Sequence, residues 1–271
     1  MAAQDGYIYE PLDITNAEEV KNVFSKYKPD VVINTAAMTN VDACEAKKDE
    51  CRKLNVDAVA FMMEECKKYK THFIQVSTDC VFDGEEGPYK EEDKPNPQSF
   101  YAQSKYDAEL LLMNSDLKWT IIRTIIIYAV IDDIGRSNLV LWTKSSLEKK
   151  QTINVISDQY RAPTLAEDLA DACISAALKG ATGIYHVSGA ETKSILEWVN
   201  IIADYFHLDK SYIKPVTTAE LNQAAKRPPR TGFVIDKAKR DLDYKPHSFI
   251  EGLGIIKRQL EAAHSKTSSL N

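Results

Sequence analysis

The sequence predicts an α/β protein built on a doubly wound parallel sheet. Short apolar runs such as Val31–Ala37 (VVINTAA) and His72–Ser77 (HFIQVS) are typical of strands that are buried on both faces. Longer segments with helical periodicity separate these runs, and that alternation favours a parallel sheet covered by helices. With 271 residues, the chain is long enough for one large domain and a smaller lobe.

The first half of the chain is expected to contain three helices and two strands. Thr15 or Asn16 is a plausible cap for the first helix, because side chains of these types accept hydrogen bonds from the first free amides. Lysines in the last turn of the second helix suit the helix dipole. The predicted elements, in order, are a helix at Glu18–Tyr27, a strand at Val31–Ala37, a helix at Glu50–Lys70, a strand at His72–Ser77 and a helix at Ser99–Asn114.

The second half begins in the same way and then loosens. We expect an isoleucine-rich strand at Trp119–Tyr128, a helix at Leu165–Lys179 and a strand at Gly183–Val187. Helices are also expected at Ser194–Phe206 and Phe249–Ala263, on either side of the polar, proline-containing stretch Lys210–Pro246. The pattern predicts a main domain of residues 1–188 with parts of 232–263, and a smaller C-terminal lobe of about 189–248 with parts of 132–161.

Composition excludes several classes of protein. The net charge of −6 gives no overall field that attracts nucleic acid. The longest apolar runs, such as Thr120–Val130, are too short to cross a bilayer, and no signal peptide is recognisable. The five cysteines form no C-x-x-C pair, which favours reduced thiols in a cytoplasmic protein. The acidic run Glu91-Glu92-Asp93 is interpreted as a solvated loop, so no catalytic metal is predicted.

The expected glycine-rich turn is absent from the start of the sequence. A doubly wound nucleotide-binding fold begins with a strand, a tight glycine turn and a helix, which together hold a pyrophosphate. The only early glycine is Gly6, and the first strand-like piece is Tyr7–Tyr9. We therefore expect a sheet that lacks its first β-α-β unit, with truncation favoured over residues left out of the numbering or a remodelled sheet. Because the first strand is usually central, Val31–Ala37 and His72–Ser77 should lie apart, and direct pairing would indicate a remodelled fold.

One segment carries a set of residues suited to carbonyl reduction. Ser77 and Thr78 end a predicted strand, at the edge of the sheet where ligands bind in such folds. Tyr101 and Lys105 follow on a predicted helix, where residues four apart share one face. Reduction of a ketone leaves an alkoxide that needs a proton. A phenol can donate it, an ammonium lowers the pKa of that phenol, and a hydroxyl of Thr78 or Ser77 can bind the carbonyl oxygen. A Y-x-x-x-K pattern alone is common by chance, but its order after a buried strand makes the combination more specific.

The same segment resembles a known family. V-S-T-D-x-V-F-D-G, then P-Y-x-E-x-D-x-P-x-P, then Y-x-x-S-K are similar to the dTDP-4-dehydrorhamnose reductases, which are extended short-chain dehydrogenases with a Rossmann-like fold. The resemblance extends from about Leu12 to about Gly252. It departs from the family pattern at Ala102, Ala129 and Cys80, and in the missing glycine turn.

The resemblance implies a set of site residues. Catalysis would use Thr78, Tyr101 and Lys105. The segment near the adenine would be Asp13 and Ile14, and Asn55 would be structural. The implied cofactor-binding residues are Asp13, Ile14, Ala36, Ala37, Thr39, Ser77, Tyr101 and Lys105. The implied substrate-binding residues are Arg161, Arg227 and Arg230, whose guanidinium groups suit a diphosphate.

The implied function is NADPH- or NADH-dependent reduction of a 4-keto nucleotide sugar, as in dTDP-L-rhamnose synthesis. Two alternatives stay open. One is a non-catalytic regulatory subunit similar to the beta subunit of methionine adenosyltransferase, which the missing glycine turn favours. The other is an epimerase or dehydratase on the same fold. The sequence leaves open the sugar, the nucleotide, the choice between NADH and NADPH, and whether the protein is a homodimer.

Overall fold

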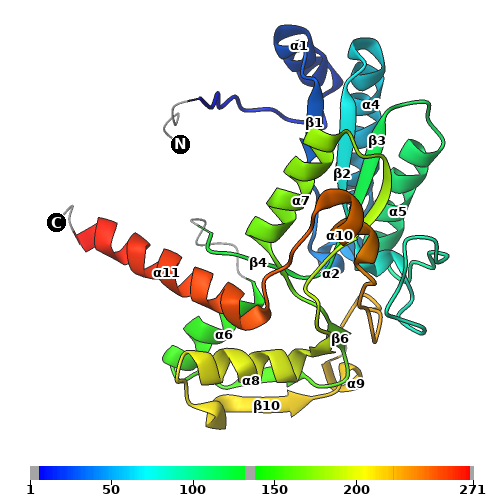
Figure 1. Ribbon diagram of the computed structural model, residues 1–271. Coiled ribbons are helices and arrows are strands. Elements are labelled where there is room, and N and C mark those ends of the chain that lie inside the picture. Colours follow the sequence, from blue (N-terminus) through cyan, green and yellow to red (C-terminus); the bar gives the residue numbers. More distant parts are fainter. Residues whose placement is uncertain (1–5, 132–137, 222, 269–271) are drawn as a thin grey trace.

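A four-stranded parallel sheet forms the centre of the main domain (Figure 1). The computed structural model describes residues 6–131, 138–221 and 223–268. The strands lie in the order β1 (Val31–Asn34), β2 (His72–Thr78), β3 (Trp119–Thr124) and β8 (Gly183–Val187). This arrangement confirms the predicted α/β class with a parallel sheet.

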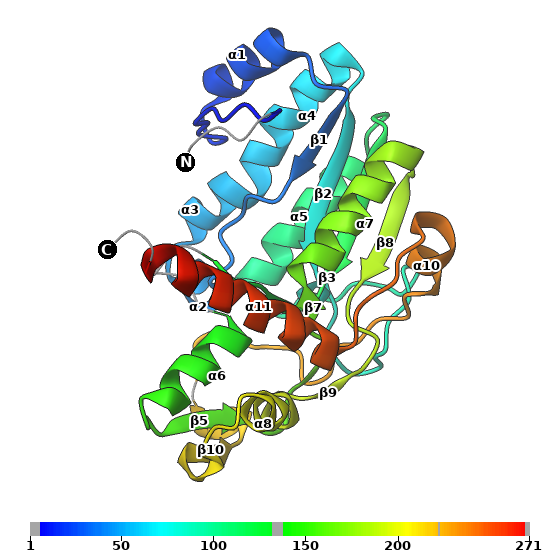
Figure 2. The same cartoon turned by 60° about the vertical axis from the view of Figure 1, so that its left-hand side comes forward.

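Helices cover both faces of this sheet (Figures 1 and 2). On one face, α1 (Ala17–Tyr27), α4 (Ala58–Tyr69) and α5 (Phe100–Met113) pack around Phe73 and Ile121. On the other face, α7 (Ala166–Lys179) and α10 (Asp236–Leu242) pack around Ile74, Ile122 and Tyr185. Alternate residues of β2 and β3 therefore belong to different cores, as the period of a strand requires.

Two helices begin at side-chain caps that fix their position. Asn16 Oδ1 accepts hydrogen bonds from the amides of Glu18 and Glu19 at the start of α1, which confirms one of the two predicted caps. Ser99 Oγ accepts from the amide of Ala102 at the start of α5. These bonds satisfy amides that have no partner within the helix, and the second one sets the register of the helix that carries Tyr101.

The helix predicted at Glu50–Lys70 is interrupted. The structure has α2 (Val41–Ala46), α3 (Lys48–Arg52), a π-helical turn η1 (Lys53–Asp57) and then α4. The π turn holds Asn55, which is buried. A single π turn inside a longer helix often marks a functional position.

The isoleucine-rich strand predicted at Trp119–Tyr128 is also split. β3 ends at Thr124, and β4 (Ile127–Tyr128) instead pairs with β7 (Thr164–Leu165). Between them, Ile126 has a φ of 27°, and Thr164 Oγ1 donates to the carbonyl of Ile125 at 2.7 Å. The chain therefore leaves the sheet here and crosses to the second lobe.

The expectation that Val31–Ala37 and His72–Ser77 lie apart is wrong. β1 and β2 pair directly in parallel, with Val31 opposite His72 and Asn34 opposite Gln75. The expectation placed the absent strand between these two, although consecutive strands of a sheet usually pair with each other. Within the described residues β1 is an edge strand that pairs only with β2, and Ile33 on it is 38% exposed.

A smaller lobe lies below the carboxyl ends of the strands in Figure 1. It contains α6 (Leu139–Glu148), β5 (Ile153–Ile156), α8 (Ile195–Tyr205) and β10 (Ile213–Val216), with β5 and β10 paired in parallel. The short elements of this part are β6 (Tyr160–Arg161), β9 (Lys193–Ser194), η3 (Lys210–Tyr212) and α9 (Thr218–Leu221). The 3-10 turn η2 (Asp79–Val81) belongs to the main domain, where it follows β2 directly.

The long helix α11 (Phe249–Ser268) packs against this lobe through Phe249, Leu253 and Ile256, whereas α10 packs on the main sheet. The lobe was expected to include parts of 132–161, and of these, residues 132–137 lie outside the described residues. Across the described ranges no helix is both long and apolar enough to cross a membrane.

Candidate active site

A cavity of about 360 Å³ opens at the carboxyl ends of β1, β2 and β3. Six residues expected at the site line it: Ala37, Thr39, Ser77, Thr78, Tyr101 and Lys105. The other lining residues are Thr35, Val41, Val76, Asp79, Cys80, Thr124, Ile126 and Ile127. The predicted Ser/Thr–Tyr–Lys set therefore converges on one cavity.

Tyr101 lies in the first turn of α5 and is buried except for its contact with the cavity. Its hydroxyl lies near the side chain of Thr78, which lines the same cavity. Burial raises the pKa of Tyr101, and the neighbouring Cys80 and Asp79 raise this pKa further. The phenol is therefore protonated at neutral pH, and the expected lowering of its pKa by Lys105 is not seen in this arrangement.

Lys105 lies one turn further along α5 and is only 4% exposed. Its ammonium donates to the carbonyl of Val76 at 2.8 Å. Burial lowers the pKa of Lys105 to about 8, while the carboxylate of Glu109 acts in the opposite direction. An ammonium has three donors, so the bond to Val76 leaves two for other groups.

Ser77 and Thr78 have different roles, although the sequence left them as alternatives. Ser77 Oγ donates to Glu109 Oε1 at 2.5 Å, beneath α5. Thr78 is the hydroxyl that contacts Tyr101, and it also donates to Asp79 Oδ1 at 3.1 Å. Only Thr78 is placed to contact a carbonyl oxygen beside the phenol.

The loop after β1 is held by side-chain hydrogen bonds. Asn55 accepts from the amide of Met38 at 2.8 Å and donates to its carbonyl at 3.1 Å. The side-chain amide of Asn55 also donates to Ser104 Oγ on α5 at 3.0 Å. The amide of Ala36 donates to Asn34 Oδ1 at 3.1 Å. Asn55 thus fixes the expected cofactor-lining segment Ala36–Thr39 relative to the helix of Tyr101 and Lys105.

Arg161 is buried, and its guanidinium contacts neighbouring groups of the protein. It donates to the carbonyls of Tyr160 at 2.7 Å and Pro228 at 2.6 Å, and it lies 3.6 Å from Asp79 Oδ2. Thr231 also donates to Asp79. Arg161 therefore braces the loops around the cavity, and its expected role in binding a diphosphate stays a prediction.

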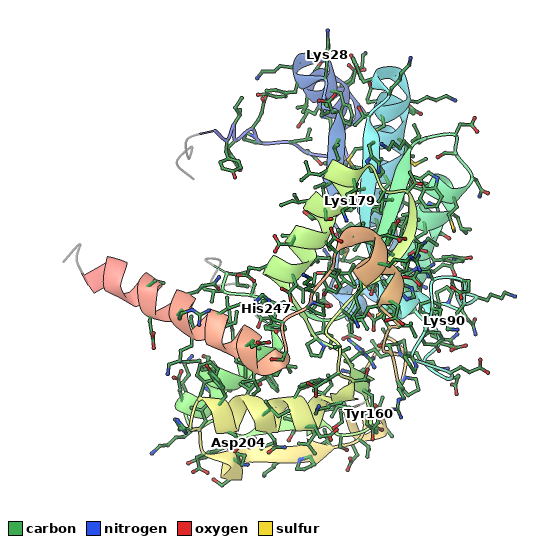
Figure 3. The ribbon with its side chains drawn as sticks, in the orientation of Figure 1. Lys28, Lys90, Tyr160, Lys179, Asp204 and His247 are labelled. Atoms are coloured by element: carbon green, nitrogen blue, oxygen red, sulfur yellow. The ribbon has the colours of Figure 1, made fainter. Side chains whose placement is uncertain are left out.

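Arg227 and Arg230 are placed differently from Arg161. Arg227 forms a two-pronged ion pair with Asp42 at the start of α2, with distances of 2.6 and 3.2 Å. Arg230 is exposed and lies over the ring of Tyr160, with 5.1 Å between the guanidinium carbon and the ring centroid. Tyr160 lies in the lower part of the molecule in Figure 3.

Asp13 and Ile14 do not line the cavity. Asp13 Oδ1 accepts from the amide and hydroxyl of Thr15, at 2.9 and 2.7 Å. Ile14 packs against the core between α1 and the sheet. Their expected role near an adenine stays a prediction.

Two buried charged residues near the cavity were not predicted as functional. Glu109 is fully buried on α5, and Arg123 on β3 donates to it through Nε and Nη2 at 3.0 and 2.6 Å. For Glu109 the sequence held an indication of its position, since Tyr101, Lys105 and Glu109 are spaced by four residues and share one helical face.

Comparison with known proteins gives three results. The model of the RmlD substrate binding domain family matches residues 3–261. The dTDP-4-dehydrorhamnose reductase of Aggregatibacter actinomycetemcomitans is 30% identical over 265 residues, which cover 93% of this chain and 89% of that protein. Methionine adenosyltransferase 2 subunit beta of Rattus norvegicus is 28% identical over 214 residues, which cover 77% of this chain and 64% of that protein.

A solved structure has the same fold over nearly the whole chain. The dTDP-4-dehydrorhamnose reductase of Bacillus anthracis in complex with NADP superimposes with a TM-score of 0.84 at 27% identity. The match covers 92% of this chain and 87% of that chain.

Proposed function

This chain belongs to the RmlD substrate binding domain family, and on that premise we propose that it reduces the keto group of a nucleotide sugar with NADPH or NADH. The substrate most like that of its relatives is a dTDP-linked 4-keto-6-deoxy sugar. The observation that carries the proposal is the convergence of Thr78, Tyr101 and Lys105 on one cavity at the carboxyl ends of the strands.

The residues of this cavity fit the nicotinamide and ribose end of the cofactor. Besides the N–H that bonds Val76, the ammonium of Lys105 has two further N–H donors, and ribose hydroxyls can accept hydrogen bonds from them. Two small residues of the loop that Asn55 fixes, Ala37 and Thr39, also line this cavity. When bound, the cofactor supplies the hydride.

The side chains would then bind the carbonyl oxygen and donate a proton to it. Thr78 hydrogen-bonds the carbonyl oxygen of the substrate next to Tyr101. As negative charge develops on that oxygen, Tyr101 donates its phenolic proton to it. The raised pKa of Tyr101 ensures that this proton is present at neutral pH. The ammonium of Lys105, which does not lower this pKa in the ligand-free arrangement, would stabilise the phenolate once the substrate and cofactor are bound.

The activity is tested by adding NADPH and a dTDP-4-keto-6-deoxy sugar to the purified protein. We expect loss of NADPH absorbance and formation of the 4-hydroxy sugar in equal amounts. NADPH binding without reduction of any 4-keto nucleotide sugar would contradict the proposal.

That negative result would favour the second candidate, a nucleotide-binding regulatory subunit. It is motivated by the 28% identity with a methionine adenosyltransferase subunit. Its own test is the formation of a stable complex with a methionine adenosyltransferase catalytic chain.

The ion pair of Arg227 leads to a prediction about substrate binding. If Arg227 and Arg230 bind the diphosphate, replacing either by alanine should raise the KM for the nucleotide sugar by roughly tenfold or more. Each substitution removes a charge-assisted hydrogen bond between a guanidinium and the diphosphate. The affinity for NADPH should change much less. Asp42→Asn, which releases Arg227 from its partner, should instead lower the KM.

Steady-state kinetics at fixed NADPH would measure these effects. Lys214→Ala, which removes an exposed cation on β10, is the matched control and should leave the KM unchanged. An unchanged KM in both arginine variants would show that Arg227 and Arg230 do not bind the substrate and that their loop is structural.

A further inference from the structure

The carboxylate of Asp79 contacts both the reactive end of the cavity and the part of the chain that carries two arginines. Asp79 follows Thr78 directly at the end of β2, lines the cavity and is only 3% exposed. Charged side chains are rarely buried unless they are paired. The partners of this carboxylate therefore indicate its role.

The two oxygens of Asp79 have different partners. Oδ1 accepts a hydrogen bond from Thr78 Oγ1 at 3.1 Å, which is long for a hydroxyl donor, so Thr78 can turn its proton toward a substrate oxygen. Oδ2 accepts from Thr231 Oγ1, 152 residues later in the sequence, and lies 3.6 Å from Arg161 Nε. Thr231 is 0% exposed and Arg161 is 5% exposed, so water has little access to this side of the carboxylate.

Residues 227–231, which include two arginines, form what we call the arginine segment, and further bonds hold it in place. The amide of Thr231 donates to the carbonyl of Tyr160 at 3.0 Å, and the amide of Tyr160 donates to the carbonyl of Pro229 at 2.8 Å. Arg161 donates to a carbonyl of the same segment at 2.6 Å. The arginine segment is therefore fixed along β6, and the contacts of Asp79 reach both of these partners.

The loop after β2 also packs tightly against the arginine segment. A methyl group on Gly84 would lie 2.7 Å from Pro228 Cβ and 2.8 Å from Pro229 Cδ, so a residue with a side chain does not fit this approach. The φ of 87° at this position favours glycine as well. Further along, the amide of Tyr89 donates to the carbonyl of Gly232 at 2.8 Å. This loop and the arginine segment therefore form one packed unit.

We propose that Asp79 is a positioning residue that holds the arginine segment at a fixed separation from Thr78. This inference rests on the proposed function, in which Thr78 binds the keto group and the two arginines bind the diphosphate. In a 4-keto nucleotide sugar these two groups lie at opposite ends of the sugar ring. The link through Asp79 lets the binding energy of the diphosphate place the keto group against Thr78.

A role of Asp79 in folding alone predicts a different result. Loss of a hydrogen bond that only stabilises the fold lowers the activity toward every substrate by the same factor. Loss of a link between the two binding groups lowers the activity only where the diphosphate contributes. The informative quantity is kcat/KM for the dTDP-linked 4-keto-6-deoxy sugar divided by kcat/KM for the methyl glycoside of the same keto sugar, which has no phosphate.

The experiment measures this ratio in Thr231→Val, which keeps the shape of the side chain but removes the donor to Asp79 Oδ2. We expect the ratio to fall by about tenfold or more, the effect of one hydrogen bond to a charged group. Activity on the methyl glycoside should be nearly unchanged. Thr231→Ser keeps the hydroxyl and should keep the ratio. An unchanged ratio in Thr231→Val, or an equal loss with both substrates, overturns the proposal.

Thr143→Val is the matched control. Thr143 is also 0% exposed, and its hydroxyl donates to the carbonyl of Leu139 within α6, in the smaller lobe. Its loss should leave the ratio at the wild-type value. If Thr231→Val does not fold, Asp79→Asn tests the same link, because the amide keeps only one of the two acceptor oxygens, and the ratio must fall there too.

A binding measurement separates this proposal from the proposed function. Calorimetry with dTDP, which has a diphosphate but no keto group, needs no turnover. We expect the Kd for dTDP to rise by about tenfold in Thr231→Val and to stay unchanged in Thr231→Ser. A wild-type protein that binds dTDP but reduces no 4-keto sugar contradicts the proposed function alone. Equal affinities of the wild type and Thr231→Val, or no binding of dTDP by the wild type, overturn the positioning role.

Discussion

Replacing Tyr101 by phenylalanine is expected to remove most of the reductase activity, with a fall in kcat on the order of 100-fold or more. The substitution deletes the hydroxyl that contacts Thr78 and that would donate the proton. Folding should be preserved, because the ring stays in its core with Cys44 and Cys51. The measurement is kcat for reduction of a 4-keto nucleotide sugar, alongside the thermal midpoint of unfolding.

Tyr106→Phe provides the matched control. Tyr106 lies on the same helix but packs, partly buried, against the core on the α7 side of the sheet. The Tyr106→Phe variant should therefore keep its reductase activity. A Tyr101→Phe protein that reduces the substrate at a nearly normal rate would remove Tyr101 from the mechanism.

Gly252→Ala is expected to destabilise the protein by about 1–3 kcal/mol, the usual range for overpacking a core. Gly252 lies in α11, and a methyl group there would collide with Tyr128 Oη and lie 3.0 Å from Tyr128 Cζ. Tyr128 is 2% exposed and packs edge-to-face against Phe249, so it has little room to move. The better helix propensity of alanine, about 1 kcal/mol, offsets only part of this cost.

The same helix offers an internal comparison. A methyl group on Gly254 would lie 3.4 Å from Tyr205 Oη and 3.6 Å from Arg258 Nη1, which is ordinary contact. Gly254→Ala should therefore be neutral or slightly stabilising. Tyr128→Phe should restore part of the stability lost in Gly252→Ala. Equal denaturant midpoints for the two alanine variants would show that Tyr128 does not constrain α11.

Much of the fold could be predicted because its signals are local. The strands β2 and β8 and the helices α1, α5 and α7 were placed within about two residues, since each has a clear apolar pattern and two of the helices, α1 and α5, have a polar cap. The break after Thr124 could not be predicted in this way. Ile125, Ile126 and Ile127 continue an apolar run, and the chain turns there because of a contact with Thr164, which is distant in sequence.

In the candidate site too, features set by residues close in sequence could be predicted, whereas features set by distant residues could not. The spacing of Tyr101 and Lys105 correctly predicted that they share a cavity. Which hydroxyl faces that cavity depended on Glu109, a partner 32 residues from Ser77. The engagement of Arg161 depended on the carbonyl of Pro228, 67 residues away. The pairing of β1 with β2 was missed because strand order is a property of the whole sheet.

The one-sided pairing of β1 has a consequence for local unfolding. Strands that pair on both sides, such as β2 and β3, open only with the whole sheet, whereas an edge strand can separate at a smaller free energy. The loop Ala36–Thr39 follows this edge strand, yet its shape depends on the bonds of Met38 to Asn55, a buried residue of the π-helical turn. Fraying of β1 would therefore leave one wall of the cavity in place, because that wall is anchored to the helices and not to the strand that leads into it.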